Sequence, residues 1–172
     1  MKLIVHPEGC KGLIDSAAGG FACALGRGGV TTVKKEGDGA TPVGVWALRR
    51  LLVRTDRMAL ENIVTGLPVS PIDRQDGWCD DPAHAAYNRP VRLPFAGGHE
   101  VMWREDHLYD LVVILGHNDT PPVPGCGSAI FMHLARPDYG PTEGCVALAR
   151  EDLLAVLATV GEGDSIEIMP EG

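Results

Sequence analysis

The sequence is poor in aromatic residues and contains no long hydrophobic run. Aromatic side chains make up 5% of the 172 residues, and no stretch approaches the ~18 apolar residues of a membrane-spanning helix. Lysine and arginine form no basic cluster either, and the formal net charge is −8. Because a duplex nucleic-acid binder needs a positive face, the sequence predicts neither a membrane span nor a nucleic-acid partner.

Paired cysteines and a recognisable secretory leader are also missing. The five cysteines are Cys10, Cys23, Cys79, Cys126 and Cys145. Their number is odd and no CxxC pair occurs, so we expect free thiols, most of them buried, rather than a disulfide framework. Lys2 is followed by only three apolar residues before His6 and Pro7, which is too short for the apolar core of a signal peptide. We therefore predict a cytoplasmic protein, or a periplasmic one if a leader has been removed.

Glycine and proline, in contrast, are abundant, with 22 and 13 residues, and hydrophobic residues make up 45% of the chain. This length and apolar content predict one domain, residues 1–172, with a sizeable core. The turn formers separate short apolar segments, which predicts a mainly β fold with one or two helices (an α+β fold). The expected strands are Lys2–His6, Phe21–Leu25, Val30–Lys34, Val43–Leu52, His99–Tyr109, Asp110–Leu115, Ala129–Met132 and Ser165–Met169.

One helix is predicted near the C-terminus. The apolar residues Leu153, Val156, Leu157 and Val160 recur at helical spacing after two acidic residues. Residues 54–94 show no clear periodicity. A stretch of that length predicts a functional or lid-like excursion rather than a simple connection.

The strongest chemical signal is a histidine and a cysteine twelve residues apart. His133 ends an apolar strand, and Cys145 follows Gly144 in a loop rich in proline and glycine. The thiolate is the nucleophilic form of cysteine, and a neighbouring imidazole can take the thiol proton and return it to a leaving amine. Gly144 has no side chain, so a substrate carbonyl could approach the nearby backbone N–H groups, which would stabilise an oxyanion. The alternative is a buried, inert thiol and a core histidine.

At these residues the sequence resembles a known family. The run Thr142-Glu143-Gly144-Cys145-Val146, after a strand that ends in His133, resembles the signature of the L,D-transpeptidase catalytic domain, the YkuD-type fold. A second match is the run GDGATPVGVW at residues 37–46, which resembles the early Thr-Pro-x-Gly-x-aromatic strand of that family. The resemblance covers roughly residues 20–169, which is most of the chain.

The resemblance implies a single β-sandwich-like catalytic domain that acts on peptidoglycan stem peptides through an acyl-enzyme. Cys145 would attack the carbonyl of the third residue of a tetrapeptide stem, an L-centre followed by D-Ala, and His133 would be the general base. An amine acceptor would then give a 3→3 cross-link, whereas water would give a tripeptide. No metal and no cofactor is implied.

Two positions depart from the family pattern. Ala147 stands where arginine or asparagine is usual, and Glu143 stands where histidine or lysine is often found. Because these positions help to hold the substrate, the departures leave the choice of acyl acceptor open. The candidate substrate-binding residues are Thr142, Tyr139, Arg136, His117 and Trp78. Thr142 could equally cap a turn.

The competing hypotheses differ in acceptor and in chemistry. Without a leader the chain would meet soluble muropeptides, with water as the abundant acceptor. The sequence therefore favours an L,D-carboxypeptidase of muropeptide recycling over a periplasmic cross-linking enzyme. A zinc hydrolase would use His117, Cys126, His133 and Cys145, although their spacings match no compact zinc pattern. A catalytically silent peptidoglycan-binding domain is the third hypothesis, and nothing in the sequence indicates an oligomeric state.

Overall fold

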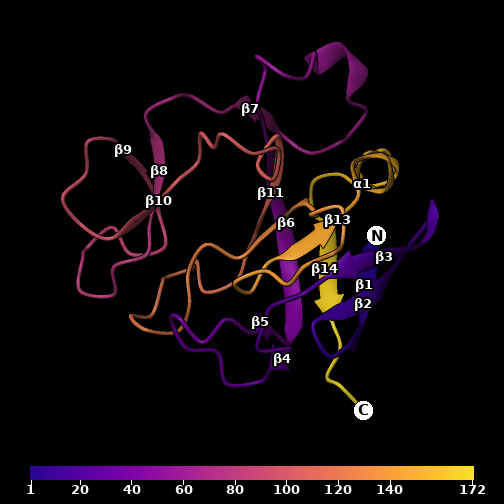
Figure 1. The fold of residues 1–172 in the computed structure, drawn as a ribbon, viewed down its shortest axis with the longest axis horizontal. Coiled ribbons are helices and arrows are strands. Elements are labelled where there is room, and N and C mark those ends of the chain that lie inside the picture. Colours follow the sequence, from indigo (N-terminus) through magenta and orange to yellow (C-terminus); the bar gives the residue numbers. More distant parts are fainter.

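Eight strands close into a barrel in the computed structural model, which describes residues 1–172 (Figure 1). Their order around the barrel is β11, β12, β13, β3, β2, β1, β14 and β6, and β6 pairs in turn with β11. The bounds are β1 Lys2–Glu8, β2 Lys11–Ser16, β3 Gly19–Ala24, β6 Gly44–Val53, β11 Leu111–Leu115, β12 Phe131–Leu134, β13 Val146–Leu148 and β14 Ser165–Ile168. The long strand β6 closes the ring, because residues 44–47 pair with β14 and residues 48–53 pair with β11.

The remaining elements are short. They are β4 Val30–Thr31, β5 Thr41–Pro42, β7 Val69–Pro71, β8 Asp76–Cys79, β9 Pro90–Arg92, β10 His99–Val101, the 3-10 helix η1 Leu60–Asn62 and the helix α1 Arg150–Leu157. The predicted fold class, mainly β with one or two helices, is confirmed. The expected strand His99–Tyr109 is too long, because the pairing with β8 ends at Val101, and farther on the Asp106 carboxylate accepts the Leu108 N–H in a turn. The sequence also misses β2, where Gly12 and Asp15 lower the strand propensity.

The two faces of β12 and β13 have different roles. Met132 and Leu134 of β12, and Val146 and Leu148 of β13, belong to one cluster of 23 buried residues inside the barrel. Because side chains alternate along a strand, the residues between them point out of the barrel. The outer face of this strand pair is therefore available for other functions.

The helix α1 covers part of the barrel core. Leu153, Val156 and Leu157 are buried in the 23-residue cluster, as their spacing predicted. The helix ends at Leu157, earlier than the pattern suggests, and Val160 stays buried in the turn that follows. No helix of the chain has the length and the apolar character needed to cross a membrane.

Residues 54–110 form an excursion that packs against the outer face of the barrel. Within it β8 pairs with β9 and β10 in a separate three-stranded sheet, which Figure 1 shows on the opposite side of the molecule from β1–β3. Ile72, Met102 and Leu108 of the excursion join Phe131 and Cys145 in a second apolar cluster. The excursion thus covers the face of β12 from which the predicted site residues project.

Candidate active site

Two neighbouring strands place the predicted nucleophile and base on one face of the barrel. β12 and β13 run parallel, with Met132 opposite Val146 and His133 opposite Ala147. Cys145 immediately precedes β13, so its side chain points to the same side of the sheet as His133, away from the barrel core. Both side chains line one pocket of about 290 Å³. The twelve-residue separation in sequence thus becomes a shared site.

Cys145 lies in this pocket as a buried thiol, 6% exposed. Its S–H donates to the Ala129 carbonyl, and the Phe131 N–H donates to its sulfur, both at 3.3 Å. Burial raises the pKa of the Cys145 thiol to about 12, and the negative charge of Glu100 contributes to the same rise. Cys145 at rest is therefore a neutral thiol, which would need a base to act as a nucleophile.

His133 has the protonation state that a base requires. Its Nδ1 lies 2.9 Å from the Leu134 carbonyl oxygen, which can only accept, so Nδ1 carries the proton and Nε2 keeps its lone pair. Burial lowers the pKa of His133 to about 4, so the imidazole is neutral near pH 7. The ring packs edge-on against Tyr109, with 5.2 Å between centroids. This packing and the Nδ1 bond hold the imidazole in a fixed orientation.

The pH dependence of Cys145 alkylation tests this neutral pair. An imidazole acts as a base only above its pKa, so the rate with iodoacetamide is expected to fall only near pH 4. At high pH the rate is expected to rise without levelling, because the thiol pKa is about 12. The measurement is peptide mass mapping in a Cys10→Ser, Cys126→Ser background. A full inflection between about pH 6 and 9 would instead indicate a resting thiolate–imidazolium pair.

The loop before Cys145 is shaped by Thr142 and Gly144. The Thr142 hydroxyl donates to the Cys145 carbonyl oxygen at 2.7 Å and accepts from the Gly144 N–H at 3.1 Å. Of the two roles considered for Thr142, this geometry is that of a turn cap. The Cys145 N–H donates to no acceptor within the protein. That amide is therefore free to donate to the oxyanion that forms when the Cys145 sulfur attacks a substrate carbonyl.

Gly144→Ala is expected to destabilise the fold and to slow the reaction. Gly144 has φ +132°, and a Cβ there would lie 2.8 Å from the Ala40 carbonyl oxygen. The expected loss is about 1–3 kcal/mol of unfolding free energy, measured by denaturant titration. Gly163→Ala is the matched control, because Gly163 also has a positive φ but no atom lies within 4 Å of its Cβ position. If Gly144→Ala and Gly163→Ala lose the same unfolding free energy, the close approach of the new Cβ to Ala40 contributes nothing to that loss.

The candidate substrate-binding residues fall into two groups. Those that line the Cys145 pocket are Arg136 and Thr142, and those outside it are Tyr139, Trp78 and His117. The Arg136 guanidinium donates to the Pro141 carbonyl. Trp78 packs edge-on against Phe131, which is in the same apolar cluster as Cys145. Tyr139 packs on the small alanine cluster next to β13. Trp78 and Tyr139 thus take part in packing around the site.

The structure does not assemble the zinc site considered above. His117 Nε2 lies 2.9 Å from the Cys126 carbonyl oxygen, and its ring meets Trp46 edge-on. No group of three or more His, Cys, Asp and Glu side chains in the chain could hold a metal ion. His133 and Cys145 share a pocket that His117 does not reach. The pocket therefore has the components of thiol chemistry, and the zinc hypothesis has no structural support.

Asn88 ties the excursion to the loop that precedes β12. Its side-chain amide donates to the carbonyls of His117 and Asn118, at 3.0 and 2.7 Å. Its carbonyl oxygen accepts from the Trp78 indole and from the Ala129 N–H, at 2.9 and 3.0 Å. All four hydrogen-bonding positions of this buried amide are used. Since the Ala129 carbonyl accepts a hydrogen bond from the Cys145 thiol, Asn88 helps to fix the backbone that Cys145 contacts.

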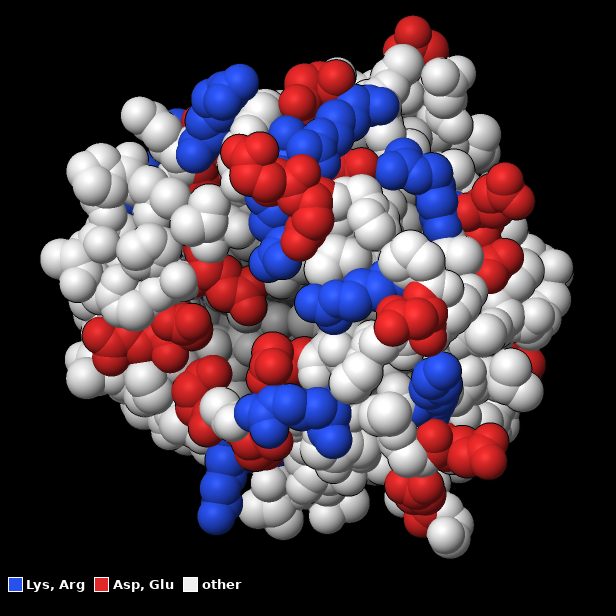
Figure 2. Space-filling view, in the orientation of Figure 1, with Lys and Arg blue, Asp and Glu red and all other residues white.

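Sequence reasoning missed several polar residues that line the pocket. They are Lys34, Glu36, Glu100, Arg104 and Tyr109. The first two come from the segment between β4 and β5, and the other three come from the excursion. Figure 2 shows acidic and basic side chains gathered around a central hollow. Glu36 begins a run typical of a turn and Glu100 lies in a predicted strand, so no local signal marks either as a pocket residue.

Comparison with known proteins identifies a family. A family model described as the L,D-transpeptidase catalytic domain (YkuD) matches residues 14–168, nearly the whole chain. The matched range contains both His133 and Cys145, together with residues 37–46. No curated protein and no solved structure matches.

Proposed function

Because the chain belongs to the L,D-transpeptidase catalytic domain family, a cysteine-dependent family that acts on peptidoglycan stem peptides, we propose that Cys145 forms an acyl-enzyme with a tetrapeptide stem. The observation that carries the proposal is the shared pocket, in which a buried thiol lies with an imidazole whose Nε2 is unprotonated. The bond broken is the one between the third residue, an L-centre, and D-Ala. Water is the proposed acceptor, which makes the protein an L,D-carboxypeptidase.

The first half-reaction follows from the protonation states. His133 Nε2 takes the proton from the thiol as sulfur attacks the carbonyl carbon, because neither group is ionised at rest. The negative charge that develops on the carbonyl oxygen is stabilised by the free Cys145 N–H. As the C–N bond breaks, His133 returns the proton to the amine of D-Ala. The product is a thioester on Cys145.

The second half-reaction uses the same base. Water gives a proton to His133 Nε2 while its oxygen attacks the thioester carbon, and the proton then passes to the leaving sulfur. A tripeptide and the free thiol result. The pocket volume of about 290 Å³ lies just below the roughly 300–1,000 Å³ of ligand sites, and water needs less room beside the acyl group than a second stem peptide would.

Family membership equally supports the alternative of an amine acceptor and a 3→3 cross-link. The two acceptors, water and an amine, are distinguished by incubating a disaccharide tetrapeptide with the protein and determining the product masses. Release of D-Ala with formation of the tripeptide supports hydrolysis, as expected for an enzyme that processes soluble muropeptides. Cross-linked dimers without free tripeptide would contradict it. The Cys145→Ala protein is the control, and release of D-Ala that this variant retains would contradict the acyl-enzyme itself.

A further inference from the structure

Glu100 of β10 is a partly buried acid that lines the Cys145 pocket and has a single hydrogen-bond partner. Its Oε2 accepts from the Tyr109 hydroxyl at 2.7 Å, and no other donor of the protein bonds to its carboxylate. Both residues belong to the excursion. The contact therefore lies between two segments of the excursion, at the wall of the pocket.

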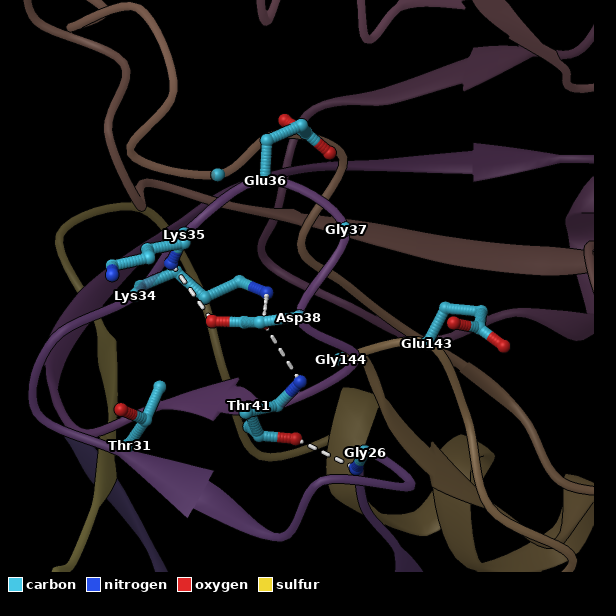
Figure 3. Close-up of polar contacts among 12 residues, drawn as sticks. Gly26, Thr31, Lys34, Lys35, Glu36, Gly37, Asp38, Thr41, Glu143 and Gly144 are labelled. Carbon is cyan, nitrogen blue, oxygen red and sulfur yellow. Dashed lines mark hydrogen bonds and ion pairs between the residues drawn. The ribbon is translucent and has the colours of Figure 1, made fainter.

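Glu100 takes part in no ion pair. Of the basic residues that line the same pocket, Lys34 is paired with Asp38, as the dashed line in Figure 3 shows, and Arg104 is paired with Asp106. Neither cation reaches the Glu100 carboxylate. An ion pair therefore does not explain the presence of an acid at this place.

A carboxylate with one neutral donor is also unfavourable in a partly buried position. Burial raises the pKa of Glu100, the hydrogen bond from Tyr109 lowers it, and the negative charge of Asp80 raises it again. The net direction is upward, so one hydrogen bond does not compensate the carboxylate for the loss of water. The stability of the fold thus does not account for Glu100, and its one contact, with Tyr109, is the place to look for a function.

Tyr109 connects Glu100 to the predicted base. Its ring packs against the His133 imidazole, with 5.2 Å between centroids, and against the Phe131 ring, with 6.0 Å. The His133 side chain has no hydrogen bond to another side chain, since its Nδ1 lies against the Leu134 carbonyl oxygen. The Tyr109 ring is therefore an aromatic contact through which the excursion reaches the base.

We propose that Glu100 is a positioning residue for His133 and that it acts through Tyr109. Its carboxylate holds the hydroxyl end of the Tyr109 side chain, and a hydrogen bond to a charged acceptor is roughly twice as strong as one to a neutral acceptor. The backbone holds the other end, just before β11. A ring fixed at both ends keeps the imidazole where Nε2 takes the thiol proton. The inference rests on the proposed function for the peptide reaction that this serves, but the proton transfer itself needs no peptide.

Alkylation of Cys145 by iodoacetamide at pH 7 tests the inference without a peptide. The background carries Cys10→Ser and Cys126→Ser, because those two thiols are not buried. Glu100→Ala removes the acceptor, and Tyr109→Phe keeps the ring but removes the donor, so each is expected to lower the rate about tenfold. Loss of the Glu100 charge alone would do the opposite, because that charge raises the pKa of Cys145. Glu100→Gln provides an oxygen acceptor again and is expected to restore the rate.

The same changes in a His133→Gln background show whether the effect passes through the base. Without an imidazole there is nothing to position, so neither Glu100→Ala nor Tyr109→Phe is expected to lower the rate further. A tenfold loss that persists in this background would overturn the proposal, as would an unchanged rate in the presence of His133. Glu105→Ala, which changes an exposed acid of the excursion, is the matched control. If circular dichroism shows that Glu100→Ala is misfolded, Tyr109→Phe, which keeps the ring, decides the outcome.

Release of D-Ala separates this inference from the proposed function. Tyr109→Phe is expected to lower kcat about tenfold with little change in KM, because the position of a base affects the chemical step. Alkylation rates that depend on Glu100 and His133 as described, in a protein that releases no D-Ala, would support the positioning role and contradict the proposed function. Release of D-Ala with alkylation rates that none of these changes affects would do the reverse.

Discussion

Cys145→Ser is expected to lower kcat/KM for D-Ala release by about 10⁴-fold or more, because the serine hydroxyl is a far weaker nucleophile than a thiolate in this buried site. The hydroxyl can still donate to the Ala129 carbonyl and accept from the Phe131 N–H, so the fold keeps its local contacts. The unfolding midpoint should therefore change little. The measurement is the initial rate of D-Ala release from a disaccharide tetrapeptide, with stability followed by thermal denaturation.

The matched control is Cys126→Ser, which changes an exposed thiol in the loop before β12 and should keep full activity. Treatment with a carbapenem gives an independent reading through the intact mass. An adduct is expected on the wild-type protein and on Cys126→Ser, and none on Cys145→Ser. Acylation of the wild-type protein excludes a silent binding domain. An adduct that persists in Cys145→Ser would place the nucleophile elsewhere.

The shared pocket of His133 and Cys145 could be predicted because its determinants are close in sequence. His133 and Cys145 flank one loop, and the strands on either side of it, β12 and β13, are direct neighbours in the barrel. An apolar run marks the strand before the loop, and the loop is long enough for the chain to fold back, so a local reading brings the two side chains together. The residue types then suggest the chemistry, and the surrounding motif identifies the family.

The closure of the barrel could not be predicted in the same way. Val43–Leu52 reads as a strand, but nothing within it shows that β6 pairs with β14 through one half and with β11 through the other. Those partners lie more than 50 residues away in sequence. Strand pairing over such distances depends on the packing of the complete core, which no short window contains.

The polar residues around the Cys145 thiol could not be predicted from the sequence, for a related reason. The length and irregularity of residues 54–94 predict a functional segment, yet the pocket is lined by Asp80, which follows β8, and by Glu100, which lies in β10 beyond that segment. Thr142 shows the opposite case, because its hydroxyl is used by the neighbouring backbone. A sequence gives the side-chain types, and the fold determines which polar atoms remain free.

His133→Gln is expected to lower the rate of Cys145 alkylation near pH 7 by about 10²–10⁴-fold, because it removes the base and leaves the thiol protonated. With the pKa of Cys145 near 12, a protein without the imidazole has almost no thiolate at that pH. Hydroxide can replace the missing base, so the deficit should shrink steadily as the pH is raised toward 10. The measurement is the rate of Cys145 alkylation by iodoacetamide across this range, in wild type and variant.

This recovery with pH distinguishes loss of a base from structural damage. Distortion of the pocket would lower the rate of Cys145 alkylation by a similar factor at every pH. Loss of the base lowers that rate most near neutral pH, where the hydroxide concentration is low. Tyr139→Phe is the control, because Tyr139 packs near β13 but lies outside the Cys145 pocket, and its profile should follow that of the wild-type protein. If the His133→Gln protein shows the wild-type rate at pH 7, the imidazole is not the base. If its deficit is the same at pH 7 and pH 10, His133 serves only to pack the site.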